Sequence, residues 1–173
     1  MRKFPIFIMS VIILIAIITF IFIASFYYSP TSNQVTESKF KQTWNSSTLG
    51  SLQVNENVIG YILNKLGAKD LHNPILSKDT PKIEVIVDDK IFNAEVEKGD
   101  IDVNKGVIEN EDIKIIMTKQ DVINIINSSS PTKSIENSIN EGTMKFEIVA
   151  SETKLVSKGY LSLYKKFSGK SIK

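Results

Sequence analysis

The hydrophobic pattern of the chain begins with a long, uncharged and mostly apolar run. Phe4 to Tyr28 carries no charged side chain and is rich in Ile and Phe. A helix rises about 1.5 Å per residue, so about 20 apolar residues cross a hydrocarbon layer of about 30 Å. We therefore predict a single transmembrane helix within residues 1–28. The polar stretch over residues 29–50 then reads as a linker to a domain over residues 51–173.

A cleaved signal peptide is the alternative for the same segment. Its apolar core usually spans about 7 to 15 residues, which is shorter than this run. Positive charges gather on the cytoplasmic side of a membrane helix. Arg2, Lys3 and the amino terminus precede the run, and no positive charge follows it until Lys39. We expect a single-pass membrane protein with a cytoplasmic N-terminus and an extracytoplasmic domain.

Beyond the linker the apolar positions follow two different periods. Val54 to Leu66 repeats apolar residues every three to four positions, which predicts a helix that Asn55 or Asn57 caps and Gly67 follows. Four segments then alternate with period two, as strands joined by tight turns do. These segments, which we predict to form an antiparallel meander, are Lys82–Val87, Ile91–Glu97, Asp100–Val103 and Asp112–Met117.

The last third of the chain returns to helical spacing. Thr118 and Asp121 have the spacing of a capping box, which predicts a helix through Ile126. Three more elements are predicted: a helix over Thr132–Asn140, a fifth strand over Met144–Ala150 and one final helix over Ser151–Phe167. This order of elements predicts an α+β domain, in which helices cover a five-stranded, mainly antiparallel sheet.

Composition narrows the function classes. The chain has 21 Lys and Arg residues against 19 Asp and Glu residues, and Arg2 and Lys3 account for the excess. A neutral domain gives no support to nucleic-acid binding. The absence of cysteine excludes disulfides and thiolate metal sites. Asn45 and Asn127 each begin an N-glycosylation sequon, which matters only for a domain outside the cell.

Residue types that carry catalysis are sparse and scattered. His72 is the only histidine and lies beside Asn73-Pro74, a loop signal. Asp100 to Glu111 resembles a calcium loop, but its glycine, Gly106, falls at the seventh position instead of the sixth. Glu95 and Glu97 share a strand face, a spacing more typical of a solvated surface. We therefore expect neither an enzyme nor a bound cofactor.

Three segments carry a resemblance to a known family. Asp112 to Ile126 has an acid, alternating hydrophobic residues, Thr and then Asp opening a helix, and Ile139 to Phe146 has a helix that ends at Gly before a strand. With the hairpin segment Phe92 to Val107, these features make Glu56 to Phe167 resemble the sterol-carrier (nonspecific lipid-transfer) domain family. The chain departs from the family at Ser128 to Pro131, where a Gly is expected.

The resemblance implies an apolar tunnel between sheet and helices that takes up lipid tails, with the last helix as a lid. The partner would be a lipid or another hydrophobic small molecule. The candidate cavity-lining residues are Met117, Ile125, Met144, Phe146, Leu155, Leu161 and Tyr164. The alternative is an interaction or homodimerisation domain of the same fold with a filled cavity. A continuous apolar cavity of about a few hundred Å³ would favour lipid binding.

Overall fold

The structure is a computed structural model that describes residues 53–168. The predicted transmembrane segment Phe4 to Tyr28 and the linker over residues 29–50 lie outside these residues. Among the helices of residues 53–168, none has both the length and the apolar character needed to cross a bilayer.

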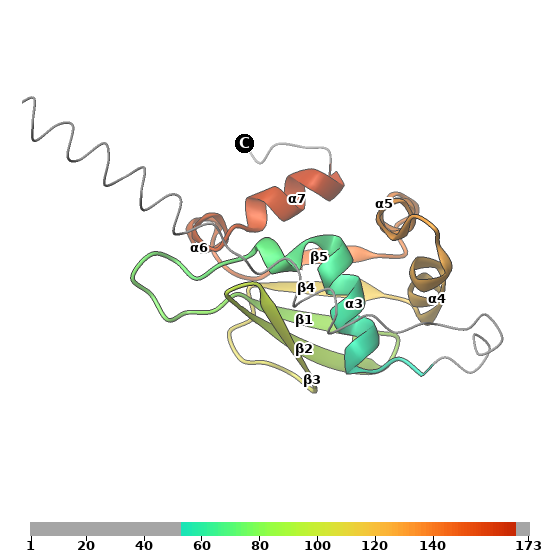
Figure 1. Ribbon diagram of the computed structural model, residues 1–173, viewed down its shortest axis with the longest axis horizontal. Helices are drawn as coiled ribbons and strands as arrows, with labels where there is room; N and C mark the ends of the chain where they lie inside the picture. The colour runs from blue at the N-terminus through green and yellow to red at the C-terminus, as the bar shows by residue number, and fades with distance from the viewer. Residues whose placement is uncertain (1–52, 169–173) are drawn as a thin grey trace, which may run out of the picture. The chain divides into compact units, whose positions relative to one another are not determined.

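Helices and strands follow one another in an α+β order (Figure 1). The first elements are helix α3 (Glu56–Leu66), a short 3-10 helix η3 (Ala68–Asp70) and the strands β1 (Lys82–Val87), β2 (Lys90–Glu97), β3 (Asp100–Lys105) and β4 (Ile113–Met117). The remaining elements are helices α4 (Lys119–Asn127) and α5 (Pro131–Glu141), strand β5 (Lys145–Ile148) and helices α6 (Glu152–Ser157) and α7 (Tyr160–Ser168). The predicted α+β class and five-stranded sheet are confirmed.

Local signals in the sequence begin α3 and α4 and end α3 where they were expected to. The Asn55 side chain accepts a hydrogen bond from the Val58 amide at 3.1 Å, and Gly67 ends α3 with a φ of 99°. Thr118 and Asp121 form the predicted capping box at the start of α4. These contacts join residues three positions apart, so the sequence alone contains them.

The sheet is mixed, with the strand order β3-β2-β1-β4-β5. β4 pairs with β1 in parallel, whereas the other three pairings are antiparallel. The predicted meander over the first four strands is therefore wrong, because β4 joins the free edge of β1 instead of β3. The physical reason lies in burial: β1 is largely buried and needs a neighbour on both sides, whereas β3 carries exposed polar residues that suit an edge.

One face of the sheet carries the core. In β2 the side chains of Phe92, Ala94 and Val96 are buried, whereas Glu95 and Glu97 are exposed on the opposite face. Helix α3 packs against β2 and β3, and also contacts α4 and α5. The two glutamates thus lie on a solvated face, as expected from their spacing.

The final helix is two helices, which corrects the single helix predicted over Ser151–Phe167. α6 ends at Ser157 and α7 begins at Tyr160. Gly159 between them has a φ of 85°, a left-handed conformation that interrupts a right-handed helix. The hydrophobic spacing did not show this break because α6 and α7 both continue an apolar face.

Candidate functional site

The core-facing side of β5 is left partly uncovered. In the β4–β5 pairing, Ile113 lies opposite Ile148 and Ile115 lies opposite Phe146, so these side chains share one face of the sheet. Ile113 and Ile115 are 5% and 0% exposed, whereas Ile148 on the edge strand is 55% exposed. Phe146 is only half-buried. The layer over the sheet therefore stops short of its last strand.

An apolar cavity of about 390 Å³ occupies this uncovered region. It lies among β5 and the elements on either side of it in sequence. The lining residues are Ile113, Ile139, Met144, Lys145, Phe146, Glu147, Ile148, Leu155, Tyr160, Leu161, Leu163 and Tyr164. Side chains of this chemistry offer dispersion contacts and desolvation to a hydrophobic ligand, and the volume falls within the range of about 300 to 1,000 Å³ that small-molecule sites have.

Five of the seven predicted cavity-lining residues meet at this cavity: Met144, Phe146, Leu155, Leu161 and Tyr164. The other two, Met117 and Ile125, are buried in the core at 2% and 0% exposure and do not line it. Met117 ends β4, next to the start of β5, and Ile125 lies in α4. Whether the five bind a ligand stays a prediction.

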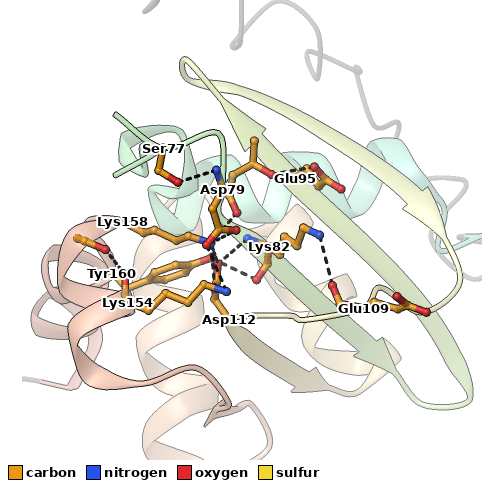
Figure 2. Close-up of polar contacts among 11 residues, drawn as sticks. Ser77, Asp79, Lys82, Glu95, Glu109, Asp112, Lys154, Lys158 and Tyr160 are labelled. Carbon is orange, nitrogen blue, oxygen red and sulfur yellow. Dashed lines mark hydrogen bonds and ion pairs between the residues drawn. The ribbon is translucent and has the colours of Figure 1, made fainter. Parts of the chain in front are cut away.

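A buried ionic cluster, shown in Figure 2, contacts the cavity-lining residue Tyr160. Its centre is Asp112, which precedes β4 and is fully buried together with Lys158. The Lys158 ammonium lies 3.1 and 2.9 Å from the two Asp112 carboxylate oxygens and donates to the Thr80 carbonyl at 2.7 Å. The Lys82 amide donates to the same carboxylate at 2.8 Å. The charges of Asp112 and Lys158, which are buried away from solvent, are thus compensated by partners from distant parts of the chain.

Two more charged residues complete the cluster at its solvent side. Lys154 Nζ lies 3.0 Å from Asp112 and 3.4 Å from Asp79, and Lys158 Nζ lies 2.9 Å from Asp79. The hydrogen bond to Asp112 raises the pKa of Lys154. Partial burial alone would raise the pKa of Asp79, but Lys158 and Lys154 outweigh it, so the pKa of this carboxyl is lowered. We call Asp79, Asp112, Lys154, Lys158 and Tyr160 the Asp112 cluster.

Tyr160 joins the Asp112 cluster to the cavity. Its ring is among the lining residues, while its hydroxyl donates to Asp112 Oδ2 and to the Lys82 carbonyl, each at 3.2 Å. Burial, with the nearby Asp112 carboxylate, raises the pKa of the phenol well above its usual value. A neutral tyrosine is therefore fixed in position at the first turn of α7.

The other sequence candidates lie away from the cavity. The His72 side chain is exposed in the loop before β1, and its Nδ1 lies 3.1 Å from the Asn73 carbonyl oxygen. Asp102 and Asn104 are exposed on β3 and hydrogen bond to each other at 3.2 Å. Among the residues that the structure describes, no group of three or more His, Asp and Glu side chains is placed to hold a metal ion.

Sequence reasoning missed the Asp112 cluster. Asp112 and Lys158 are 46 positions apart, so no local spacing links them. The available signal was Lys154 and Lys158 at helical spacing beside the apolar Leu155, since a lysine on the buried side of a helix needs an acidic partner.

Comparison with known proteins adds little to this geometry. No family model matches the chain, and no curated protein matches it. Among solved structures it is similar to palmitated SCP2L2 from Aedes aegypti, with 14% identity, coverage of 61% of this chain and 92% of that chain, and a TM-score of 0.37. It is also similar to UbiJ-SCP2, a ubiquinone synthesis protein, with 12% identity, coverage of 48% and 67%, and a TM-score of 0.33.

A third likeness is to the sec-alkylsulfatase Pisa1 from Pseudomonas sp., with 14% identity, coverage of 62% of this chain and a TM-score of 0.35. This chain spans only 16% of that sulfatase, and 12% of a double mutant of the same enzyme. At these scores the function has to be inferred from the cavity itself.

Proposed function

We propose that the chain is a membrane-tethered, non-catalytic module that binds or transfers a lipid or a similar hydrophobic molecule. The observation that carries the proposal is the apolar cavity of about 390 Å³ over the uncovered face of β5. A plain core would have closed there, because protein interiors pack to crystal-like density. The likeness of three sequence segments to the sterol-carrier domain family supports the same ligand class.

The charged residues around the cavity favour binding over catalysis. Lys145 and Glu147 are exposed rim residues on β5, alternating with Phe146 and Ile148. Their side chains point to the opposite face of the sheet, because Glu147 pairs with Lys114 and Lys145 with Ile116, so the strand presents only apolar side chains to the cavity. Tyr160 directs its hydroxyl into the Asp112 cluster, away from a role as a proton donor to ligand.

A pair of matched substitutions tests the cavity. Ile148→Trp fills it, whereas Val149→Trp adds the same ring at the neighbouring exposed position, which is not a lining residue. With a fragment that begins at residue 50, Ile148→Trp should weaken binding of the fluorescent fatty acid cis-parinaric acid by about tenfold or more, which is about 1.4 kcal/mol. Val149→Trp should change it by less than about twofold. Equal effects, or no binding by the unsubstituted fragment, would remove the proposal.

Homodimerisation is the second candidate, and one observation favours it. β5 is an edge strand, and its end carries Ile148 and Val149 at 55% and 49% exposure. Pairing of two β5 edges would cover these side chains. Sedimentation equilibrium separates the two functions. A homodimerisation domain would be a dimer in the absence of cis-parinaric acid, and Ile148→Trp would change its dimer dissociation constant instead of its affinity for the fatty acid.

The predicted topology places the domain outside the membrane that holds Phe4 to Tyr28, with Arg2 and Lys3 on the cytoplasmic side. Because the chain has no cysteine, Asn127→Cys gives one thiol at an exposed position of the domain. A membrane-impermeant maleimide should label this thiol in intact cells. Labelling only after the cells are broken would place the domain on the cytoplasmic side.

A further inference from the structure

A tight turn before β1 presents two large apolar side chains to solvent. The Ser77 amide donates to the Pro74 carbonyl at 3.0 Å, which closes the turn. Ile75 and Leu76 at its tip are 92% and 104% exposed. Leu76 has a φ of 65°, a left-handed conformation that is unfavourable for a bulky L residue. An exposed leucine held in such a conformation is an outlier that points to function.

The base of the turn is fixed by the Asp112 cluster. The His72 amide donates to the Lys158 carbonyl at 3.1 Å, and the Asp79 amide donates to Ser77 Oγ at 3.0 Å. The Asp79 carboxylate pairs with Lys158 at 2.9 Å, as Figure 2 shows. Both ends of the loop, at His72 and at Asp79, are thus attached to Lys158, which lies just before Gly159 and Tyr160 in the chain. The apolar tip is preorganised, which lowers the entropy lost on binding.

We propose that Ile75 and Leu76 insert into the surface of the bilayer that holds the N-terminal segment. Two side chains are too few for a stable protein interface, which needs about 1,000 Å² or more. They suit insertion to about 5–10 Å, at the boundary between headgroups and acyl chains.

The inference rests on the anchor of the proposed function. The predicted linker over residues 29–50 would reach about 25 Å, and a short tether would give an effective concentration of about mM. Weak insertion of Ile75 and Leu76 is then sufficient to hold the turn at the surface of the bilayer. The segment over residues 69–79 carries Lys69 and Lys78 against Asp70 and Asp79, so it has no formal excess of positive charge and the insertion does not require anionic lipid.

A single-tryptophan experiment on the full chain tests the insertion. Trp44 is the only tryptophan, so Trp44→Phe gives a silent background. Ile75→Trp reports on the turn, and Val107→Trp is the matched control. Val107 is 69% exposed and lies shortly after β3. The last residue of β3, Lys105, pairs with Phe92 near the connection between β1 and β2, whereas the turn at Ile75 and Leu76 precedes the opposite end of β1.

Each protein is reconstituted in phosphatidylcholine vesicles with or without brominated acyl chains. Brominated lipid should lower the fluorescence of Ile75→Trp by about twofold or more, as expected for a ring at the acyl boundary. It should leave Val107→Trp nearly unchanged. Adding Leu76→Asn, a residue that accepts the left-handed conformation, should reduce the quenching of Ile75→Trp.

Three results would overturn the inference. Equal quenching at positions 75 and 107 would show tether proximity alone. No quenching at 75 with shielding from aqueous acrylamide would indicate a protein partner or a second copy. If the chain does not float with the vesicles, both the proposed membrane anchor and the proposed insertion would be contradicted. Binding of cis-parinaric acid by the same proteins reports on the cavity separately, so failed insertion and failed ligand binding are distinguishable.

Discussion

At the scale of single residues, Asp112 connects more of the molecule than any local motif does. Its backbone amide donates to the Lys82 carbonyl at 2.9 Å, and its carbonyl accepts from Val149 and Ala150 at 3.1 and 2.9 Å. Its carboxylate meets Lys158 and Tyr160 from the α6–α7 junction. The starts of β1 and β4 and the end of β5 are therefore fixed to the helices that border the cavity.

Removing the buried lysine should expose the cost of an uncompensated charge. Lys158→Met keeps most of the side-chain volume but leaves the Asp112 carboxylate buried with fewer partners, so the free energy of unfolding should fall by about 3–5 kcal/mol. Urea unfolding of the fragment from residue 50 measures it. Lys105→Met is the control, because Lys105 and its partner Glu56 are 70% and 39% exposed and should shift the urea midpoint little. Equal shifts would contradict the assigned role of the Asp112 cluster.

Tyr160 makes a pH-dependent prediction. Burial and the Asp112 carboxylate raise its pKa in the folded state, whereas a tyrosine in the unfolded chain ionises near its ordinary pKa of 10.0. The unfolded state therefore loses a proton first as pH rises above about 10, and stability falls with pH in that range. Tyr160→Phe should make this alkaline fall shallower while costing about 1–2 kcal/mol at neutral pH.

The urea midpoint measured from about pH 8 to about pH 11 tests the Tyr160 prediction. Tyr164→Phe, on the same helix and also at the cavity, is the matched control. If the wild-type protein and the Tyr160→Phe variant lose stability in parallel at alkaline pH, the phenol is not the titrating group.

At the scale of elements, the sequence predicted what is local and missed what is not. The capping box of Thr118 and Asp121 was predictable because its partners lie three residues apart. The parallel pairing of β1 with β4 was not, since Ile83 and Ile113 are brought together only after two hairpin strands intervene. The break at Gly159 was also missed, because the apolar face that continues through α6 and α7 favoured one helix over the stop signal that the glycine itself gives.

Gly159 should be sensitive to any side chain. A Cβ there meets a left-handed backbone and would lie 3.2 Å from His72 Nε2, whereas a Cβ at Gly142, with a φ of 76°, meets no atom within 4 Å. Gly142→Ala should therefore cost about 1–2 kcal/mol from backbone strain alone. Gly159→Ala should cost more, and His72→Ala should recover the difference. Thermal unfolding of the single and double variants measures this, and equal losses at both glycines would show that the His72 contact does not matter.

At the scale of the whole molecule, the apolar pattern indicated the layer between sheet and helices, but neither the existence of a cavity in that layer nor its boundary. Met144, Phe146, Leu155, Leu161 and Tyr164 carry an apolar pattern that assigns them to the space between sheet and helices. Whether that space is filled depends on how far the helical layer extends over the edge strand. Met117 and Ile125 have the same pattern and lie in solid core. Period and composition do not separate these two environments, because both require an apolar side chain.

Tethering makes a kinetic prediction for the whole chain. If the proposed anchor holds the domain at a bilayer through residues 29–50, the domain would meet that bilayer at an effective concentration of about mM, whatever the bulk concentration. In a Trp44→Phe, Val149→Trp background, energy transfer from the new tryptophan to cis-parinaric acid in the vesicles reports loading of the cavity. For the full chain the loading rate should be independent of vesicle concentration, since the donor bilayer is the protein's own.

For the fragment from residue 50, the loading rate should rise in proportion to vesicle concentration, because each transfer needs a bimolecular encounter. Ile75→Asn together with Leu76→Asn should slow loading of the full chain without changing equilibrium binding by the fragment, if the turn brings the cavity to the bilayer. A rate for the full chain that rises with vesicle concentration would mean that the anchor does not supply the ligand. The cavity would then take its ligand from solution, and the proposed anchor over Phe4 to Tyr28 would have no part in supplying it.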